Sequence, residues 1–208
     1  MKEYLIYIPI FLIGYLIGCP NMALLLAKLK GVDLRGGGSG NPGASNAMVL
    51  MGWKAGIIVG LFDIGKGVLA VLLARYLFPS AALAGVVGGV ACVLGHIFPF
   101  YTLFKGGKGF ASYLGMALAL NWKFALILLV AVALITLITN YIVIGTMTTI
   151  ITLPIYYAIC SSLVTALVLS VASVVMIYKH RENLVRIANG TEIGFRSANR
   201  GEWRADKK

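Results

Sequence analysis

The sequence predicts an all-α, polytopic integral membrane protein, and two observations lead to that fold class. Apolar runs recur along almost the whole chain of 208 residues, and several exceed about 18 residues, the signature of a membrane-spanning helix. Charged residues make up only 12% of the chain, against about 25% in a soluble domain. The chain therefore carries too little charge to cover a globular surface in water.

Polar breaks divide the apolar sequence into about seven predicted spans. In order, they are Tyr4–Ala27, Lys54–Phe78, Ala81–Phe98, Phe110–Leu120, Phe124–Thr139, Val143–Ile159 and Leu163–Tyr178. The fourth is too short to cross about 30 Å of hydrocarbon alone, so we expect it to be tilted, shielded or extended into the loop before it. Merging the shortest spans would leave five or six. We expect one membrane-embedded domain, 1–208, with a retained first span and a basic tail over 179–208.

The distribution of basic residues predicts the orientation of the chain. One side of the membrane would hold 13 Lys and Arg in its loops and tail, and the other side 3. The richer side is cytoplasmic by the positive-inside rule. With seven spans, the N-terminus then lies outside and the C-terminus in the cytoplasm.

The net charge of +11 would favour nucleic-acid binding in a soluble protein. Here the basic residues flank apolar spans, where they act as topology signals, so we expect no nucleic-acid partner. Cys19, Cys92 and Cys160 are isolated within apolar runs. They are predicted to be small core residues, and neither a disulfide nor a metal site is expected.

The first polar segment, 36–46, is rich in glycine and contains Ser39, Asn41 and Asn46. Glycines let backbone N–H groups approach an anion closely. A helix beginning near Ala44 would aim its positive end at the same place. The segment therefore favours an anion site, with a flexible loop as the alternative.

The second polar segment, 95–109, ends in Lys105-Gly106-Gly107-Lys108-Gly109. Lysine supplies a strong point charge for phosphate. The segment lacks the first glycine and the Ser or Thr of a nucleotide-binding P-loop, so it does not predict ATP. The alternative is that both lysines only anchor the loop on the cytoplasmic side.

The third polar segment, 179–192, contains His180, Asn183, Arg186 and Glu192. If the segment is helical, His180 and Asn183 share one face and Arg186 extends it. The alternative is an amphipathic tail on the anionic inner leaflet. All three polar segments fall on the predicted cytoplasmic side, so they can converge on one site.

Two charged residues, Asp63 and Lys66, lie three positions apart within a predicted span. Charges inside a membrane are costly and are usually paired or functional. We interpret them as an internal ion pair that orients the site. His96, at the end of the third span, is predicted to be a satisfied interfacial histidine rather than a base.

The three segments together, with Asp63 and Lys66, resemble the motifs of the acyl-phosphate:glycerol-3-phosphate acyltransferases (PlsY family) over the whole chain. The resemblance implies acyl transfer from acyl phosphate to glycerol 3-phosphate in the bacterial cytoplasmic (inner) membrane, giving lysophosphatidic acid and phosphate. It implies no cofactor and no metal. The expected partners are the two substrates and membrane lipid, and we expect a monomer.

The resemblance also implies roles for individual residues. The expected catalytic residues are Ser39, Lys108, His180 and Asn183. The residues expected to bind the donor phosphate are Gly106, Gly107, Lys108, Gly109 and Ser39. The residues expected to bind the acceptor are Asn41, Asn46, His180, Asn183 and Arg186. The supporting residues are Asp63, Lys66, His96, Glu192 and Thr146. The donor phosphate itself would take the proton of the attacking hydroxyl.

The chain departs from the family pattern at three positions. Val49 stands where the family usually has an arginine that would grip the acceptor phosphate. Asn140 replaces an arginine before Tyr141, and Thr146 replaces a serine. The cations that could compensate for Val49 are Lys54, Arg35, Arg181 and Arg186.

Three alternatives to this acyltransferase remain open. The first is a divergent paralogue that acylates another acceptor. The second is a small anion or solute transporter, which would place its polar groups near the bilayer midplane rather than at one face. The third is a scaffold for other lipid enzymes.

Overall fold

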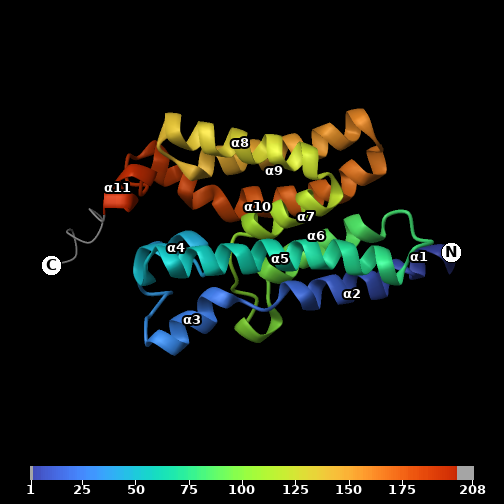
Figure 1. The fold of residues 1–208 in the computed structure, drawn as a ribbon, viewed down its shortest axis with the longest axis horizontal. Coiled ribbons are helices and arrows are strands. Elements are labelled where there is room, and N and C mark those ends of the chain that lie inside the picture. The colour runs from blue at the N-terminus through green and yellow to red at the C-terminus, as the bar shows by residue number, and fades with distance from the viewer. Residues whose placement is uncertain (1, 201–208) are drawn as a thin grey trace. The chain divides into compact units, whose positions relative to one another are not determined.

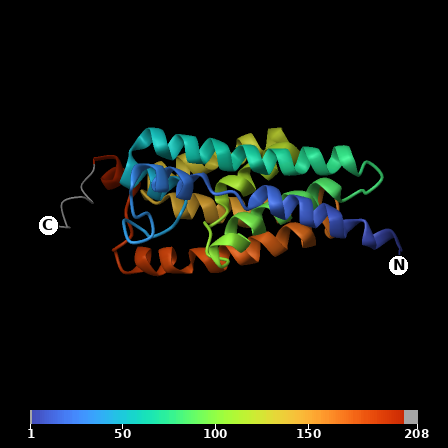
Figure 2. The ribbon, with the colours of Figure 1, turned by 90° about the horizontal axis from the view of Figure 1, so that it is seen from below.

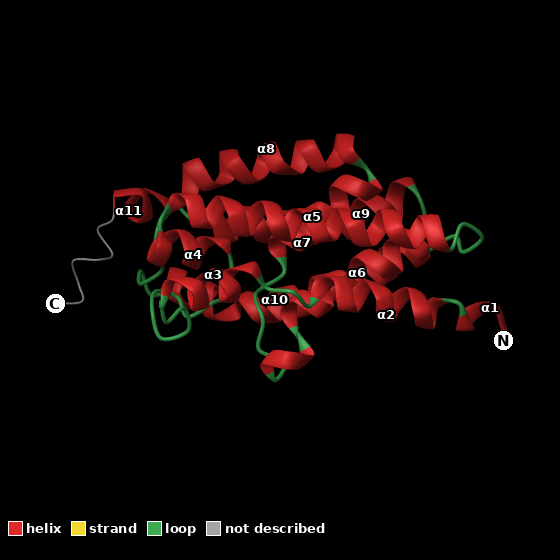
Figure 3. Cartoon of the chain, turned by 60° about the horizontal axis from the view of Figure 1, so that its bottom comes forward, coloured by secondary structure: helices red, strands yellow, loops and turns green. Residues whose placement is uncertain are grey.

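The protein is described by a computed structural model over residues 2–200 (Figure 1). The described residues form helices joined by loops, with no strand among them (Figure 3). This confirms the predicted all-α class. The chain divides into two compact units, Met1–Trp122 and Lys123–Lys208, and each is described by itself. The single membrane-embedded domain stays a prediction.

The helices follow the predicted spans closely. The first unit contains α1 (Lys2–Leu5), α2 (Tyr7–Gly18), α3 (Met22–Lys30), α4 (Ala44–Met51), α5 (Trp53–Leu77), α6 (Ala84–Ile97), the short 3-10 helix η1 (Phe100–Thr102) and α7 (Phe110–Leu120). The second contains α8 (Trp122–Thr139), α9 (Ile142–Cys160), α10 (Leu163–Ala188) and α11 (Phe195–Arg200).

Within the described residues, six helical stretches are long and apolar enough to cross a membrane. They are Tyr7–Lys30, Trp53–Leu77, Ala84–Thr102, Trp122–Thr139, Ile142–Cys160 and Leu163–Ala188. Helix α7 has the predicted bounds of the short fourth span and, at 11 residues, is not among the six. The predicted orientation depends on whether α7 also crosses, and it stays a prediction.

The first predicted span, Tyr4–Ala27, corresponds to the stretch Tyr7–Lys30, which consists of two helices rather than one. It is interrupted after α2 at Cys19 and Pro20, and α3 begins after Asn21. The Asn21 side chain accepts a hydrogen bond from the Leu24 N–H at 2.9 Å and so caps α3. A proline removes a backbone donor, and asparagine is a preferred N-cap, so the break is encoded locally.

Glycines allow the helices of the first unit to pack with their backbones in contact. Gly18 of α2 lies against the backbone of Cys92 on α6, and Gly95 of α6 lies against the Tyr15 carbonyl. Figure 2 shows α2, in blue, beside the green α6. Gly115 of α7 lies in the same way against the backbone of α5. A side chain at these positions would push the helices apart, as is general for small residues at membrane helix contacts.

The second unit is built around the pair α9 and α10, which pack on one another (Figure 1). The Ser173 hydroxyl of α10 donates to the Ile150 carbonyl of α9 at 2.9 Å. Helix α10 runs to Ala188, ten residues beyond the predicted end of the last span at Tyr178. The beginning of the predicted tail is therefore helical, and His180 and Asn183 lie on the buried face of α10.

A tight turn at Asn140, between α8 and α9, holds the segment that follows α10. Asn140 has a positive φ of 68°, a conformation that asparagine tolerates better than most residues. Its carbonyl accepts from the Phe195 N–H at 2.7 Å. Its side-chain oxygen accepts from the Arg196 N–H at 2.8 Å.

Asn140→Ala is expected to lower the free energy of unfolding by about 2–3 kcal/mol, because it adds left-handed strain to the loss of one hydrogen bond. Asn140→Gly relieves the strain and should cost about 1 kcal/mol less. Thermal unfolding in detergent measures both. An alanine variant as stable as the glycine variant would contradict the strain argument.

Candidate active site

The first glycine-rich loop, 36–46, is organised by Asn46. This side chain is 2% exposed. Its oxygen accepts from the Ser39 N–H at 2.9 Å, and its amide donates to the carbonyls of Leu34 (2.9 Å) and Gly37 (3.2 Å). Asn46 was expected to bind the acceptor, but most of its hydrogen-bonding capacity is used inside the loop. In this structure Asn46 shapes the loop.

Helix α4 begins at Ala44, as the sequence predicts. The predicted site residues Ser39 and Asn41 lie in the loop before it, where Ser39 is exposed and Asn41 half-buried. Gly38 and Gly40 on either side of Ser39 have positive φ angles of 58° and 67°. These two positions require glycine or a residue that tolerates the left-handed region. The loop therefore presents the Ser39 side chain at the surface of the first unit.

Arg35 joins the first glycine-rich loop to the second. Its guanidinium donates to the Lys105 carbonyl at 2.9 Å. The Pro42 carbonyl of the first loop also accepts from Asn21 at 3.0 Å, which ties that loop to the α2–α3 break. Two of the three predicted polar segments are thus adjacent in the first unit, and Figure 3 draws their non-helical parts in green.

The second loop is fastened to the end of α6. The Gly106 N–H donates to the Ile97 carbonyl at 3.0 Å, and the Gly107 N–H donates to the His96 carbonyl at 3.1 Å. We expected these two amides to hold the donor phosphate, and in this structure they are occupied by the backbone of α6. Lys108 and Gly109 follow directly and lead into the N-terminus of α7.

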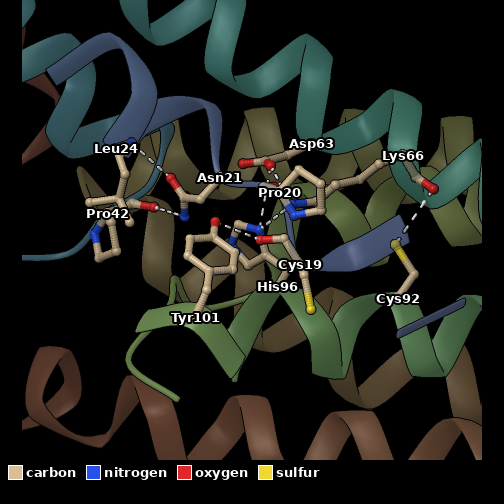
Figure 4. Close-up of polar contacts among 10 residues, drawn as sticks. All are labelled: Cys19, Pro20, Asn21, Leu24, Pro42, Asp63, Lys66, Cys92, His96 and Tyr101. Carbon is tan, nitrogen blue, oxygen red and sulfur yellow. Dashed lines mark hydrogen bonds and ion pairs between the residues drawn. The ribbon is translucent and has the colours of Figure 1, made fainter. Parts of the chain in front are cut away.

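A buried cluster of three charged or polar side chains lies beside this loop. Figure 4 shows Asp63, Lys66 and His96 converging next to the α2–α3 break. Lys66 Nζ lies 2.8 Å from Asp63 Oδ1, 2.8 Å from His96 Nδ1 and 2.9 Å from the Pro20 carbonyl oxygen. All three side chains are at most 5% exposed. The predicted ion pair of Asp63 and Lys66 is present.

The structure revises the interpretation of His96. Its Nδ1 is engaged by hydrogen bonding, and the side chain belongs to the buried cluster and is only 4% exposed. Its Nδ1 lies 3.4 Å from Asp63 Oδ1 as well as 2.8 Å from Lys66 Nζ. It is therefore buried inside the protein, and its place at the membrane interface stays a prediction.

The third predicted segment lies in the second unit, where Glu192 gathers two of its residues. The carboxylate of Glu192 accepts from Asn183 Nδ2 at 2.6 Å through Oε1 and from Arg186 Nε at 2.6 Å through Oε2. The Glu192 N–H in turn donates to the Arg186 carbonyl at 3.1 Å. Asn183, Arg186 and Glu192 are thus brought together, with Glu192 in the predicted supporting position.

His180 and Thr146 also lie in the second unit. His180 is buried on α10, and its Nδ1 lies 2.8 Å from the Met176 carbonyl oxygen, to which it donates. Thr146 of α9 is buried, and its hydroxyl donates to the Ile142 carbonyl of its own helix at 3.0 Å. The Thr146 hydroxyl is thus engaged in its own helix rather than in the Glu192 cluster.

Glu192→Ala is expected to destabilise the end of α10 by about 2–3 kcal/mol, because the buried Asn183 amide and the Arg186 guanidinium both lose a charge-assisted hydrogen bond. Activity should fall with it if Asn183 acts in the reaction. Glu182→Ala is the matched control, since Glu182 is exposed and its carboxylate lies 3.7 Å from Arg181 at the surface. Thermal unfolding of both variants in detergent tests this, and equal stability would contradict it.

Sequence reasoning missed Asn21, which both caps α3 and holds the first loop. The signal was present, because a proline followed by an N-cap residue inside an apolar run marks a helix boundary. It also missed the bond from Arg35 to the second loop, which no local pattern reveals.

The four cations proposed to compensate for Val49 have different surroundings. Arg186 is held by Glu192, and Arg181 lies over the Tyr178 ring at 3.9 Å from its centroid. Lys54 lies 5.8 Å from the centroid of the Trp53 ring. In the described structure, Arg35 is the only one of these four cations that hydrogen-bonds to a glycine-rich loop distant from it in sequence.

Comparisons with known proteins show the family to which the chain is related. Residues 8–190 match the family described as glycerol-3-phosphate acyltransferase. Glycerol-3-phosphate acyltransferase 1 of Oceanobacillus iheyensis is 35% identical over 193 residues, covering 89% of this chain and 93% of that protein. The Clostridioides difficile glycerol-3-phosphate acyltransferase is 36% identical, covering 91% of this chain and 96% of that protein.

Two crystal structures of PlsY (YgiH), described as an integral membrane glycerol 3-phosphate acyltransferase, have similar folds. The glycerol 3-phosphate form has a TM-score of 0.86 with 33% identity, covering 93% of this chain and 97% of the other. The lysophosphatidic acid form has a TM-score of 0.81 with 33% identity, covering 89% and 93%. The chain is an integral membrane protein with several apolar helices, and it belongs to the PlsY family of glycerol-3-phosphate acyltransferases.

Proposed function

We propose that this protein transfers a fatty acyl group from acyl phosphate to the 1-hydroxyl of glycerol 3-phosphate in phospholipid synthesis. The products are lysophosphatidic acid and inorganic phosphate. The family match over most of the chain supports the reaction. The observation in the fold that carries it is the junction of the two glycine-rich loops, where Arg35 bonds to the Lys105 carbonyl. Ser39 belongs to the first of these loops and Lys108 to the second.

The donor phosphate is assigned to the Lys108 side of this junction. Lys108 supplies a positive charge, and the N-terminus of α7 directly after it adds the positive end of a helix dipole. Ser39 lies in the other loop as a further polar group. Since Gly106 and Gly107 use their amides on α6, these glycines serve close packing rather than phosphate binding.

The chemistry needs little more than positioning and charge stabilisation, because an acyl phosphate is already activated. The acceptor hydroxyl oxygen attacks the acyl carbonyl carbon, and the bond from that carbon to the phosphate oxygen breaks. The leaving phosphate takes the hydroxyl proton. His180 and Asn183 are proposed to help bind glycerol phosphate, with Glu192 fixing Asn183.

We also propose a location and an orientation for the chain. It lies in the bacterial cytoplasmic membrane with both glycine-rich loops on the cytoplasmic side, because the basic residues favour that side. The water-soluble acceptor is then met at that face, while the acyl chain stays among the apolar helices. The protein acts as a monomer.

The test is acyl transfer by the detergent-purified protein, given palmitoyl phosphate and labelled glycerol 3-phosphate. Labelled lysophosphatidic acid is the expected product. Release of phosphate from the donor without labelled product would instead assign another acceptor, in keeping with Val49 at the position of the family arginine. A folded protein that neither releases phosphate nor forms product would contradict the proposal.

A further inference from the structure

The buried cluster of Asp63, Lys66 and His96 ends at the second glycine-rich loop. An ammonium group has three protons and no acceptor. Lys66 Nζ hydrogen-bonds to the Pro20 carbonyl and to His96 Nδ1, and it forms an ion pair with Asp63 Oδ1 at 2.8 Å. His96 Nδ1 therefore accepts, and the hydrogen-bond network assigns the ring proton to Nε2.

The Nε2 edge of His96 faces Gly107. A Cβ added at Gly107 would collide first with His96 Nε2 and would lie 3.0 Å from Cε1 and 3.1 Å from Cδ2. The Gly107 N–H also bonds to the His96 carbonyl. The imidazole edge and the loop backbone are thus in direct contact, one residue before Lys108.

The His96 ring has two polar contacts, a hydrogen bond with Lys66 and an ion pair with Asp63, and both are made by Nδ1. Within the described residues, the Nε2–H has no acceptor. A donor held in a fixed tautomer by a buried ion pair is suited to an acceptor that arrives with a ligand.

We propose that His96 is a ligand-binding residue of the donor-phosphate site, whose Nε2–H donates to a phosphate oxygen held by the Lys108 loop. Asp63 and Lys66 are positioning residues that fix the ring and its tautomer. The proposal rests on the proposed function, since it assigns the phosphate of the acyl donor to this loop.

Two substitutions separate the two edges of the ring. His96→Asn places an oxygen near the position of Nδ1, so it keeps the acceptor for Lys66 and loses the donor toward Gly107. His96→Gln places an amide near the position of Nε2 and gives up the bond to Lys66. A purely structural histidine would tolerate the first better than the second.

Steady-state kinetics should show the opposite order, with activity retained better in His96→Gln than in His96→Asn. His96→Asn is expected to fold like the wild type and to lose about tenfold to a hundredfold in kcat/KM for palmitoyl phosphate, the range for a hydrogen bond to a charged group. The KM for glycerol 3-phosphate should not change. His96→Gln is expected to be less stable but to stay within about threefold of the wild-type kcat/KM. Wild-type kinetics in His96→Asn, or losses that follow thermal stability in both variants, would overturn the proposal.

Spectroscopy of the unmodified protein tests the same proposal without a substitution. The chain has only two histidines, and the structure gives them opposite ring protons, because His180 Nδ1 donates to the Met176 carbonyl. Nitrogen-15 histidine spectra in detergent should therefore separate them by tautomer. Inorganic phosphate should shift the Nε2–H signal of His96, and a signal unmoved at saturating phosphate would contradict the proposal. This readout does not depend on acyl transfer, so it distinguishes a failed phosphate site from a failed proposed function.

Discussion

Lys66→Met is expected to lower the free energy of unfolding by about 3–5 kcal/mol, because it leaves Asp63 as an uncompensated buried charge. Both side chains are buried, and the ammonium also satisfies the Pro20 carbonyl and His96. The loss would loosen α5 from the α2–α3 break and from α6 together. Thermal unfolding and size-exclusion chromatography in detergent measure it.

Two companion variants make this expectation specific. Lys54 lies on the same helix, at its exposed start. Lys54→Met should therefore change the free energy of unfolding little, as most surface substitutions do. The double variant Asp63→Asn with Lys66→Met removes both charges and should recover much of the lost stability, since the largest penalty is the unpaired ion. A single Lys66→Met variant as stable as Lys54→Met would show that the pair does not hold the first unit together.

The helical class and most helix ends could be predicted from the sequence, because the apolar runs and their polar breaks are local signals. The short helix α7 was predicted with its observed bounds, Phe110–Leu120. Two features were not predicted. The break at Pro20 was hidden within an apolar run, and α10 continues to Ala188 because its polar end is helical and partly buried. Burial of polar residues depends on tertiary partners, which periodicity alone does not reveal.

The sequence indicated the residues of the candidate site more fully than the contacts that these residues make. The i, i+3 spacing of Asp63 and Lys66 correctly indicated an ion pair, since those positions are neighbours on a helix. The contact of His96 with that pair was not indicated by the sequence, because it depends on packing between α5 and α6. Likewise, the glycines of the second loop suggested open amides, whereas Gly106 and Gly107 complete the end of α6. Sequence shows which donors exist, and only the fold shows which are already used.

Lys108→Met should lower kcat/KM for acyl transfer by at least about a hundredfold, the usual cost of removing one stabilising donor from a developing oxyanion site. Lys108 is half-buried beside the N-terminus of α7, so its charge acts on phosphate with less screening than a fully exposed lysine. The fold should be preserved, because methionine matches the length of the apolar part of the side chain. The assay is lysophosphatidic acid formation, with thermal unfolding in parallel.

Lys105→Met is the matched control, three residues earlier in the same loop. The Lys105 carbonyl accepts from Arg35 and from the Thr102 hydroxyl, and these backbone contacts survive the substitution, while the exposed side chain is lost. If both lysines only attracted anions to a basic loop, the two variants would lose activity to a similar extent, and both losses would shrink at high salt. A selective loss in Lys108→Met that persists at high salt would instead mean that this one ammonium contacts the reacting phosphate.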